Sequence, residues 1–294
     1  MMKKLRLLLT LSVICGIFAG CSGKEPDIVV GAKDFTEQHI LGHMLVLLIE
    51  ANTNLKVSYR SDLSSDVIFA GIRTGVVDLY VDYTGTVYSG HLKYSDSTDP
   101  EEVHKVAARE LKDKFNLRML DPLGFNNTFY LAVRTDTAAE HGLRTFSDLA
   151  KVSSGFIFGG SAEILARFDG IPNLKRVYDM SFKEERAMDG AARYIAITND
   201  EIQVTEVFST DGFILEYALV VLEDNKSFFP PYQGVVVITD DAAEKYPELP
   251  AVLGKLTGIL TDDIMRDLNY RVDMLNESPG TVAEKFLRAR NLIR

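Results

Sequence analysis

Short apolar runs alternate with longer amphipathic stretches along the first third of the chain. The runs 27–33, 55–60 and 78–83 contain β-branched and aromatic residues, and we expect each to be a β-strand. The stretches 40–51 and 66–75 between them are expected to be helices. Strand, helix, strand, helix, strand implies parallel pairing with right-handed crossovers, so the pattern predicts an α/β fold.

The end of the first expected strand carries a helix-start pattern. Asp34 and Glu37 are three residues apart and resemble a capping box that opens the first helix. Ligand sites of parallel sheets lie at the carboxyl ends of the strands. We therefore expect a site at the loops that follow Lys33 and Tyr83.

A second α/β block begins near Gly124. A helix is expected to start in the segment 145–152, which opens with a Ser/Thr/Asp cap. A further apolar strand is expected at 234–240, and the chain is then predicted to be helical to its end. The expected strands of the second block are 128–134, 155–160 and 202–208.

Two segments rich in Pro and Gly are expected to connect two lobes. They have the sequences DPLGFNN and FFPPYQG, and hinges are expected near 121–126 and 230–235. The same residue types also mark ordinary turns. The expected division puts 27–123 with 234–294 in lobe 1 and 124–233 in lobe 2.

The composition is that of a globular protein. The 294 residues are 46% hydrophobic and 25% charged, with two Cys and no Trp. This argues against a disordered, collagen-like or disulfide-stapled chain, and the length allows roughly two domains of about 100–200 residues. The formal net charge is −10, and no block of Lys and Arg stands out, so nucleic acid is not expected as a partner.

The first twenty residues read as a targeting segment. A basic start is followed by an apolar run over 7–20, which is short for a membrane span and ends in small residues before Cys21. The sequence FAGC resembles the lipobox of a bacterial lipoprotein signal, although Phe18 stands where that pattern prefers Leu. The resemblance implies a signal peptide over 1–20, cleavage before Cys21 and diacylation of its sulfur. The alternative is a plain secretory peptide.

Removal of that segment changes the chemistry available to the chain. Cys15 leaves with it, so Cys21 is the one cysteine of the mature chain, and an internal disulfide, a Cys nucleophile and a structural zinc site are excluded. The net charge falls from −10 to −13 because three basic residues are lost. With 21–26 as a polar tether, we expect a soluble body held outside the cytoplasmic membrane by its N terminus.

The sequence contains little that supports a catalytic function. His39 and His43 have the i, i+4 spacing of two metal ligands, but the adjacent Glu of a zinc hydrolase is missing. Ser209 and Asp211 lie outside any G-x-S-x-G elbow, and a P-loop is absent. We therefore expect no catalytic residue, no metal and no cofactor, with a hydrolase as the weakest alternative.

Six short motifs occur in one order along the chain and carry a family resemblance. Together they resemble the substrate-binding lipoproteins of ABC importers for glycine betaine, choline and related quaternary ammonium compounds. The resemblance implies a two-lobed periplasmic-binding-protein fold that closes on a ligand between its lobes. The motifs are KDFTEQ (33–38), DYTGT (82–86), GFNNTF (124–129), SAEILAR with FDG (161–170), FSTDG (208–212) and FFPPY (228–232).

The resemblance also implies an aromatic box for the trimethylammonium head. A quaternary ammonium cannot donate a hydrogen bond, and ring faces attract it by about 0.5–2 kcal/mol per ring. Carried over motif by motif, the box falls on Tyr83, Phe129, Phe208 and Tyr232. Familiar betaine binders have Tyr where this chain has Phe129 and Phe208, so two hydroxyls are lost while the ring faces remain.

The same match implies partners for the carboxylate of a betaine. These would be Lys33, Thr86 and Arg167, of which the guanidinium can bind a carboxylate through two hydrogen bonds. Asn127 would lie near the cationic head. The implied partners of the chain are a small zwitterion or cation and ABC permease subunits driven by a cytoplasmic ATPase. Choline, carnitine, a larger betaine such as ergothioneine, and a sensory role instead of transport stay open.

Overall fold

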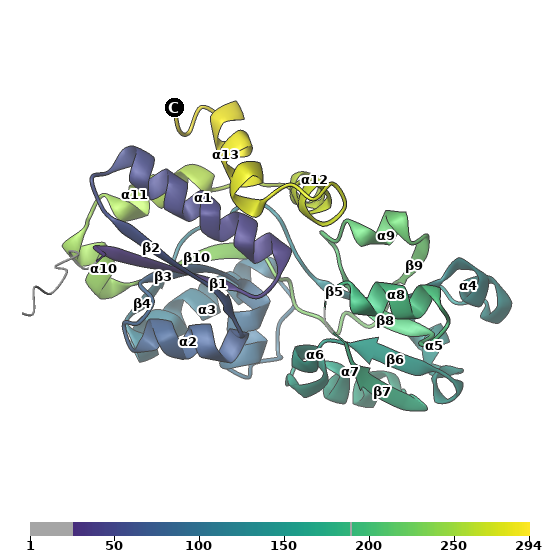
Figure 1. Ribbon diagram of the computed structural model, residues 1–294. Coiled ribbons are helices and arrows are strands. Elements are labelled where there is room, and N and C mark those ends of the chain that lie inside the picture. Colours follow the sequence, from purple (N-terminus) through teal and green to yellow (C-terminus); the bar gives the residue numbers. More distant parts are fainter. Residues whose placement is uncertain (1–25, 189) are drawn as a thin grey trace, which may run out of the picture.

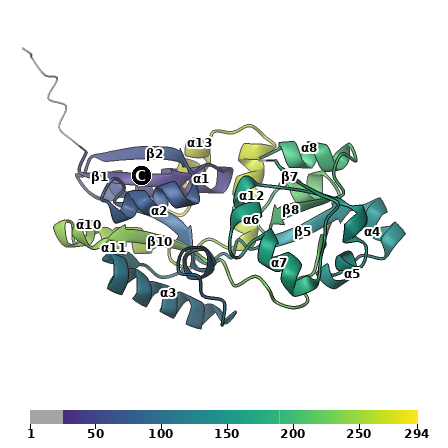
Figure 2. The same ribbon diagram turned by 90° about the horizontal axis from the view of Figure 1, so that it is seen from below.

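The computed structural model describes residues 26–188 and 190–294, except the side chain of Leu215. Its strands form two mixed five-stranded sheets, with the orders β2-β1-β3-β10-β4 and β7-β6-β8-β5-β9. Helices flank each sheet, and the two units lie side by side as two lobes (Figures 1 and 2). The predicted α/β fold with two lobes is confirmed. In the described part of the chain no helix combines the length and the apolar character that a membrane crossing requires.

The first lobe contains the first sheet and most of the C-terminal helices. Its first half comprises β1 (Ile28–Lys33), α1 (Thr36–Asn52), β2 (Val57–Leu63), α2 (Ser65–Arg73), β3 (Leu79–Tyr83), the π-helical turn η1 (Thr86–His91), α3 (Pro100–Phe115) and β4 (Leu117–Met119). The chain returns to it as β10 (Gly234–Thr239), α10 (Asp240–Lys245), α11 (Leu249–Leu253), η3 (Gly254–Leu256), α12 (Asp262–Asp273) and α13 (Pro279–Ala289).

The second lobe is continuous in sequence. It comprises β5 (Phe129–Arg134), α4 (Thr135–His141), α5 (Phe146–Ala150), η2 (Ser153–Gly155), β6 (Ile157–Gly160), α6 (Ala162–Ala166), α7 (Ile171–Tyr178), β7 (Glu184–Ala187), α8 (Ala192–Thr198), β8 (Val204–Phe208), α9 (Phe213–Glu216) and β9 (Leu219–Leu222).

The returning strand β10 completes the first sheet. As predicted, β1 pairs in parallel with β2 and β3, whereas β10 runs antiparallel between β3 and β4. All six residues of β10 are buried, as its apolar run GVVVIT requires for a central strand covered on both faces. Helix α1 packs on the sheet and against α11, α12 and α13, and it lies directly over the strands in Figure 1.

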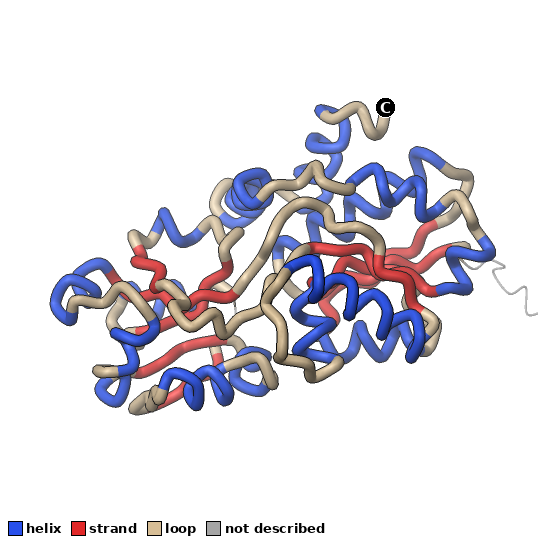
Figure 3. Tube along the Cα trace, turned by 180° about the vertical axis from the view of Figure 1, so that it is seen from behind, coloured by secondary structure: helices blue, strands red, loops and turns tan. Residues whose placement is uncertain are grey.

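Two segments cross between the lobes, and they lie next to each other. In Figure 3 both are tan loops between the two red sheets. The backbone N–H of Asn127 donates to the carbonyl of Tyr232 at 2.9 Å, and Asn126 and Gln233 form an antiparallel bridge. Gly124 has φ +114°, and a Cβ there would meet the carbonyl oxygen of Leu260 at 2.7 Å, so this turn requires glycine. Backbone hydrogen bonding therefore holds the two crossing segments against each other.

The helix-start predictions have different outcomes. The cap of α5 is confirmed: the Thr145 hydroxyl accepts from the N–H of Asp148, and the Asp148 carboxylate accepts from the N–H of Thr145. The capping box of Asp34 and Glu37 is wrong. The residue at the N-cap of α1 is Phe35, which makes no side-chain cap, and Asp34 is exposed. The carboxylate of Glu37 instead points into the protein, where side chains from other elements donate to it.

Three strands were missed in the sequence. β4 has only three residues, β7 is the polar run EERA at a sheet edge, and β9 is the four-residue run LVVL. Each is too short for a periodic pattern to develop. Their positions are set by pairing with neighbouring strands, and a local sequence pattern carries no information about that pairing.

Candidate ligand-binding site

Aromatic residues gather where strand ends of the two sheets face each other. Tyr83 ends β3, Phe129 begins β5, Phe208 ends β8, and Tyr232 precedes β10 by two residues. Phe35 follows β1 and connects the set. Successive ring centroids lie 6.4 Å apart from Tyr83 to Phe35, 6.2 Å to Phe208, 5.0 Å to Phe129 and 5.2 Å to Tyr232. The structure thus brings all four predicted ring residues into one continuous aromatic wall.

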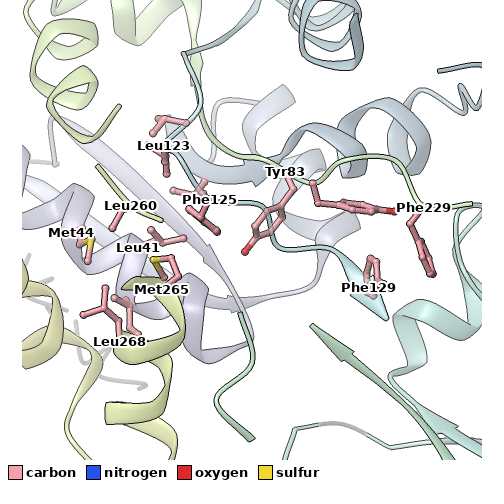
Figure 4. Close-up of a cluster of buried hydrophobic side chains, with 14 of the residues drawn as sticks. Leu41, Met44, Tyr83, Leu123, Phe125, Phe129, Phe229, Leu260, Met265 and Leu268 are labelled. Atoms are coloured by element: carbon pink, nitrogen blue, oxygen red, sulfur yellow. The ribbon is translucent and has the colours of Figure 1, made fainter. Parts of the chain in front are cut away.

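The wall belongs to both lobes and to a crossing segment. Figure 4 shows Tyr83 and Phe129 near each other, with Phe125 and Phe229 on their outer sides. Tyr83, Phe129 and Tyr232 are buried, while Phe35 and Phe208 are half-buried. The rings of Phe35 and Phe208 are stacked and nearly parallel, with 6° between their planes. Neighbouring aromatic ring faces attract a cation that has no hydrogen-bond donors.

Hydrogen bonds fix the two tyrosine rings. The Tyr83 hydroxyl donates to Glu37 Oε1 at 2.7 Å and accepts from Gln38 Nε2 at 3.0 Å. The Tyr232 hydroxyl donates to Asp169 Oδ2 at 2.6 Å. Burial, followed by the neighbouring carboxylate in each case, raises the pKa of both phenols well above the usual value. Both therefore stay protonated and act as donors.

Arg167 lies beside Phe129 but is already paired. It follows α6, whose N-terminus is capped by the Ser161 hydroxyl, and its own backbone is extended. Its guanidinium donates to Asp169 at 2.6 and 2.8 Å and to Glu163 at 2.6 Å. Its carbon Cζ lies 5.5 Å from the Phe129 ring centroid. Burial opposes ionisation of Asp169, yet the charge of Arg167 keeps the pKa of that carboxyl below its usual value.

Thr86 and Lys33, the other residues predicted to bind a ligand carboxylate, make different contacts. Thr86 Oγ1 accepts from Arg167 Nη2 at 3.4 Å, so this contact joins the lobes. Lys33 Nζ lies 2.7 Å from Asp82 Oδ1 and 5.2 Å from the Tyr83 ring centroid. The side chains of Lys33 and Asp82 are 3% and 0% exposed. Burial works against the Asp82 charge, but Lys33 holds the pKa of this carboxyl well below its usual value.

Asn127 lies at the base of the wall, two residues before Phe129. Its Nδ2 donates to Glu37 Oε1 at 2.7 Å. Its Oδ1 is buried and has no hydrogen-bond partner among the described residues. This leaves one free acceptor beside the rings.

Sequence reasoning missed four residues that shape this site. Phe35 and Glu37 lie within the motif KDFTEQ, and their place after a strand end was the available signal. Asp169 lies in the motif FDG, which by itself does not indicate a role for this carboxylate. Arg193 had no signal: it is brought in by α8, and its Cζ lies 5.6 Å from the Phe208 ring centroid.

A cavity of about 270 Å³ lies close to the aromatic wall. It is bounded by η1 and the segment after it from the first lobe, and by α7 and the second crossing segment. Asp169 belongs both to its lining and to the hydrogen bonds that hold Tyr232 and Arg167. Phe168, Val177, Phe228 and Pro230 supply its apolar lining.

The residues considered for enzyme chemistry have structural contacts. His39 Nε2 lies 3.3 Å from Asp62 Oδ1, and the ring of His43 packs against Tyr59. Ser209 Oγ donates to the Asn126 carbonyl at 2.7 Å and so fastens the first crossing segment. The part of the chain that the structure describes contains no group of three His, Cys, Asp or Glu arranged to hold a metal.

Comparison with known proteins identifies the family. A model described as the substrate-binding domain of ABC-type glycine betaine transport systems matches residues 26–289, and the chain belongs to this family of extracytoplasmic transport receptors. A solved structure described as a glycine betaine/carnitine/choline ABC transporter is 34% identical, with a TM-score of 0.73 over 90% of this chain and 99% of that one. The family predicted from the six motifs is confirmed.

Two curated relatives carry different ligand names. The chain is 35% identical to the carnitine transport binding protein OpuCC of Listeria monocytogenes, over 97% of this chain and 94% of that protein. It is 37% identical to the ergothioneine transport permease/ergothioneine binding protein EgtU of Helicobacter pylori, over 92% of this chain. It spans 48% of the length of EgtU.

The buried pair of Lys33 and Asp82 gives a stability prediction. Asp82→Asn leaves a buried ammonium without its counter-charge, and we expect the free energy of unfolding at pH 7 to fall by about 3–5 kcal/mol. Because the folded-state pKa of Asp82 is lowered, the difference from wild type is complete above about pH 4 and shrinks as the pH falls through that folded-state pKa. Urea unfolding at several pH values measures both effects.

The double variant Lys33→Met/Asp82→Asn is the control for this prediction. It removes the unpaired ammonium as well, so it should recover at least about 1 kcal/mol relative to Asp82→Asn. A double variant as unstable as the sum of the single variants would contradict the pairing.

Proposed function

We propose that the chain is a non-catalytic, lipid-anchored receptor that captures a quaternary ammonium solute outside the cytoplasmic membrane and delivers it to an ABC permease. The observation that carries this proposal is the aromatic wall, to which both lobes contribute rings. A trimethylammonium group offers methyl groups and positive charge but no N–H, so ring faces attract it better than acceptors that need a donor.

The polar end of a betaine would meet Arg167 and Thr86. The guanidinium of Arg167 is buried beside Phe129 and reaches across to the first lobe. In this structure the guanidinium donates to both Glu163 and Asp169. A ligand carboxylate would therefore take the place of one of these two acceptors. Lys33, paired with Asp82, would act through its charge over the Tyr83 ring.

Ligand capture would proceed by movement of the lobes about the two crossing segments. The proposed hinges are near 121–126 and 230–235, with 27–123 and 234–294 as one body and 124–233 as the other. Tyr232 lies in the second of these segments and Asn127 just beyond the first. The same segments would therefore carry site residues and change conformation on closure.

A larger betaine is the second candidate ligand. The relative EgtU is named for ergothioneine and matches this chain over 272 residues. Phe129 and Phe208 provide rings without hydroxyls, which suits an apolar or heterocyclic extension of a betaine better than the tyrosines usual in betaine binders. A competition titration between glycine betaine and ergothioneine separates the two candidates.

The lipid anchor is part of the proposal. Cys21 and the signal segment 1–20 lie outside the described residues. The sequence FAGC supports diacylation at Cys21. Mass spectrometry of the membrane-bound protein tests this directly.

Removal of the Tyr232 ring should weaken binding. Tyr232→Ala takes one face from the aromatic wall, and we expect at least about a tenfold rise in Kd, which corresponds to about 1.4 kcal/mol. Tyr232→Phe keeps the ring and should stay within about threefold of wild type. Isothermal titration calorimetry measures both variants, and an unchanged Kd for Tyr232→Ala would exclude this ring from the site.

Arg167 should distinguish betaines from choline. Choline has no carboxylate, so Arg167→Ala is expected to raise the Kd of glycine betaine at least about tenfold more than that of choline. The ratio is taken within one variant, so a general loss of stability cancels. Equal losses for the two ligands would refute the role of Arg167.

A further inference from the structure

Glu37 is a buried carboxylate at the centre of the site. It lies in the first turn of α1 and is 2% exposed. Four side chains donate to it: Tyr83 and Asn127 at 2.7 Å each, Thr210 at 2.6 Å and Asn269 at 3.2 Å. They come from the end of β3, from the segment just before β5, from the segment after β8 and from α12, so both lobes meet at this carboxylate.

The hydrogen bonds of Glu37 place it among the aromatic rings. Phe35 precedes it by two residues, and Tyr83 donates to it directly. Asn127 is two residues before Phe129, and Thr210 is two residues after Phe208. The carboxylate is therefore fixed from each of the strand ends that carry Tyr83, Phe129 and Phe208.

Glu37 differs from the other buried carboxylates in its lack of a basic partner. Lys33 pairs with Asp82, Arg167 with Asp169, and Arg193 lies 3.7 Å from Asp211. None of the ion pairs in the described part of the chain includes Glu37. All four of its donors are neutral groups. A buried carboxylate in such surroundings is stabilised further when a cation comes near it.

We propose that Glu37 is a specificity-determining residue of this cleft, whose carboxylate supplies the negative charge opposite the ligand's ammonium group and admits ligands of net positive charge such as choline. This inference rests on the proposed function. It assigns the two ends of a ligand to opposite sides: Arg167 takes a carboxylate, and Glu37 attracts the ammonium. A zwitterion gains attraction for its head from Glu37 and repulsion for its carboxylate, whereas choline gains attraction alone.

Proton release from Glu37 on ligand binding provides an independent readout. Burial raises its pKa, and a cation bound nearby lowers it again, so binding should release protons from the empty form. Three other carboxyls on or beside β8 and α12 have pKa values raised by burial: Glu206 in β8, Asp211 after it and Asp273 at the end of α12. The basic groups around the site have carboxylates beside them: Lys33 pairs with Asp82, Arg193 lies 3.7 Å from Asp211, and Arg266 pairs with Asp263.

The experiment is isothermal titration calorimetry with choline, glycine betaine, carnitine and ergothioneine. For Glu37→Gln we expect the Kd of choline to rise at least about tenfold and that of the tightest zwitterion less than about threefold. Glu37→Asp keeps the charge and should retain the wild-type ratio within about threefold. Glu50→Gln is the matched control, because Glu50 is an exposed Glu on the same helix, and neither Kd should change.

Repeating the choline titration at several pH values between about 5 and 8, each in two buffers of different ionisation enthalpy, measures proton release. The wild type, Glu50→Gln and Asp273→Asn should release protons, and Glu37→Gln should release none. Circular dichroism checks folding. If Glu37→Gln does not fold, proton release by the wild type and by Asp273→Asn decides, and its absence at every pH overturns the inference.

Other outcomes also decide the matter. Binding of a zwitterion without binding of choline, equal losses for both ligand types in Glu37→Gln, or no loss at all would each overturn the role of Glu37 while the proposed function stands. A wild-type chain that binds none of the four compounds would refute the proposed function itself.

Discussion

The attraction between a methylated ammonium and the faces of aromatic rings is the interaction on which this account of the molecule depends. A single ring contributes about 0.5–2 kcal/mol, so several rings must converge on one point to hold a small solute. One sheet edge does not carry enough of them here. The rings come from the segment after β1, from β3, β5 and β8, and from the second crossing segment, and they meet only because the two lobes face each other. The aromatic wall is therefore complete only in an arrangement in which the two lobes face each other, as they do in this structure.

The charges of the cleft are balanced locally. Each buried basic side chain at the aromatic wall has a carboxylate beside it, which keeps the cost of burying these charges small. The same pairs hold the lobes in register: Arg167 and Asp169 of the second lobe reach Thr86 and Tyr232. The network thus orients the rings through their polar neighbours. Glu37 differs from these carboxyls because its donors are all neutral side chains.

Much of this arrangement can be predicted from the sequence, because the motifs lie at strand ends. The resemblance of six motifs to a receptor family implies that Tyr83, Phe129, Phe208 and Tyr232 lie together, and apolar runs predict the strands at which they lie. The pairing of the charges could not be found in the same way. Arg193 reaches Phe208 from a helix fifteen residues upstream, and Asp82 meets Lys33 across 49 residues. Such contacts depend on strand order, which a local pattern does not contain.

Glu37 illustrates the limit most clearly. Its spacing from Asp34 is that of a capping box, yet the chain enters α1 through Phe35, and the carboxylate turns toward donors 46 to 232 residues away. The capping box would give Glu37 one hydrogen-bond partner, whereas the tertiary structure gives it four. Sequence spacing identified the residue but assigned it to the wrong interaction.

A crystal structure of the chain bound to glycine betaine or choline tests the central claim most directly. The account predicts that the ammonium nitrogen lies within about 6 Å of ring centroids from both lobes, Tyr83 or Phe35 on one side and Phe208 or Phe129 on the other. A solute seated against the rings of one lobe alone, or bound in the cavity beside Phe168 and Phe228, would contradict it.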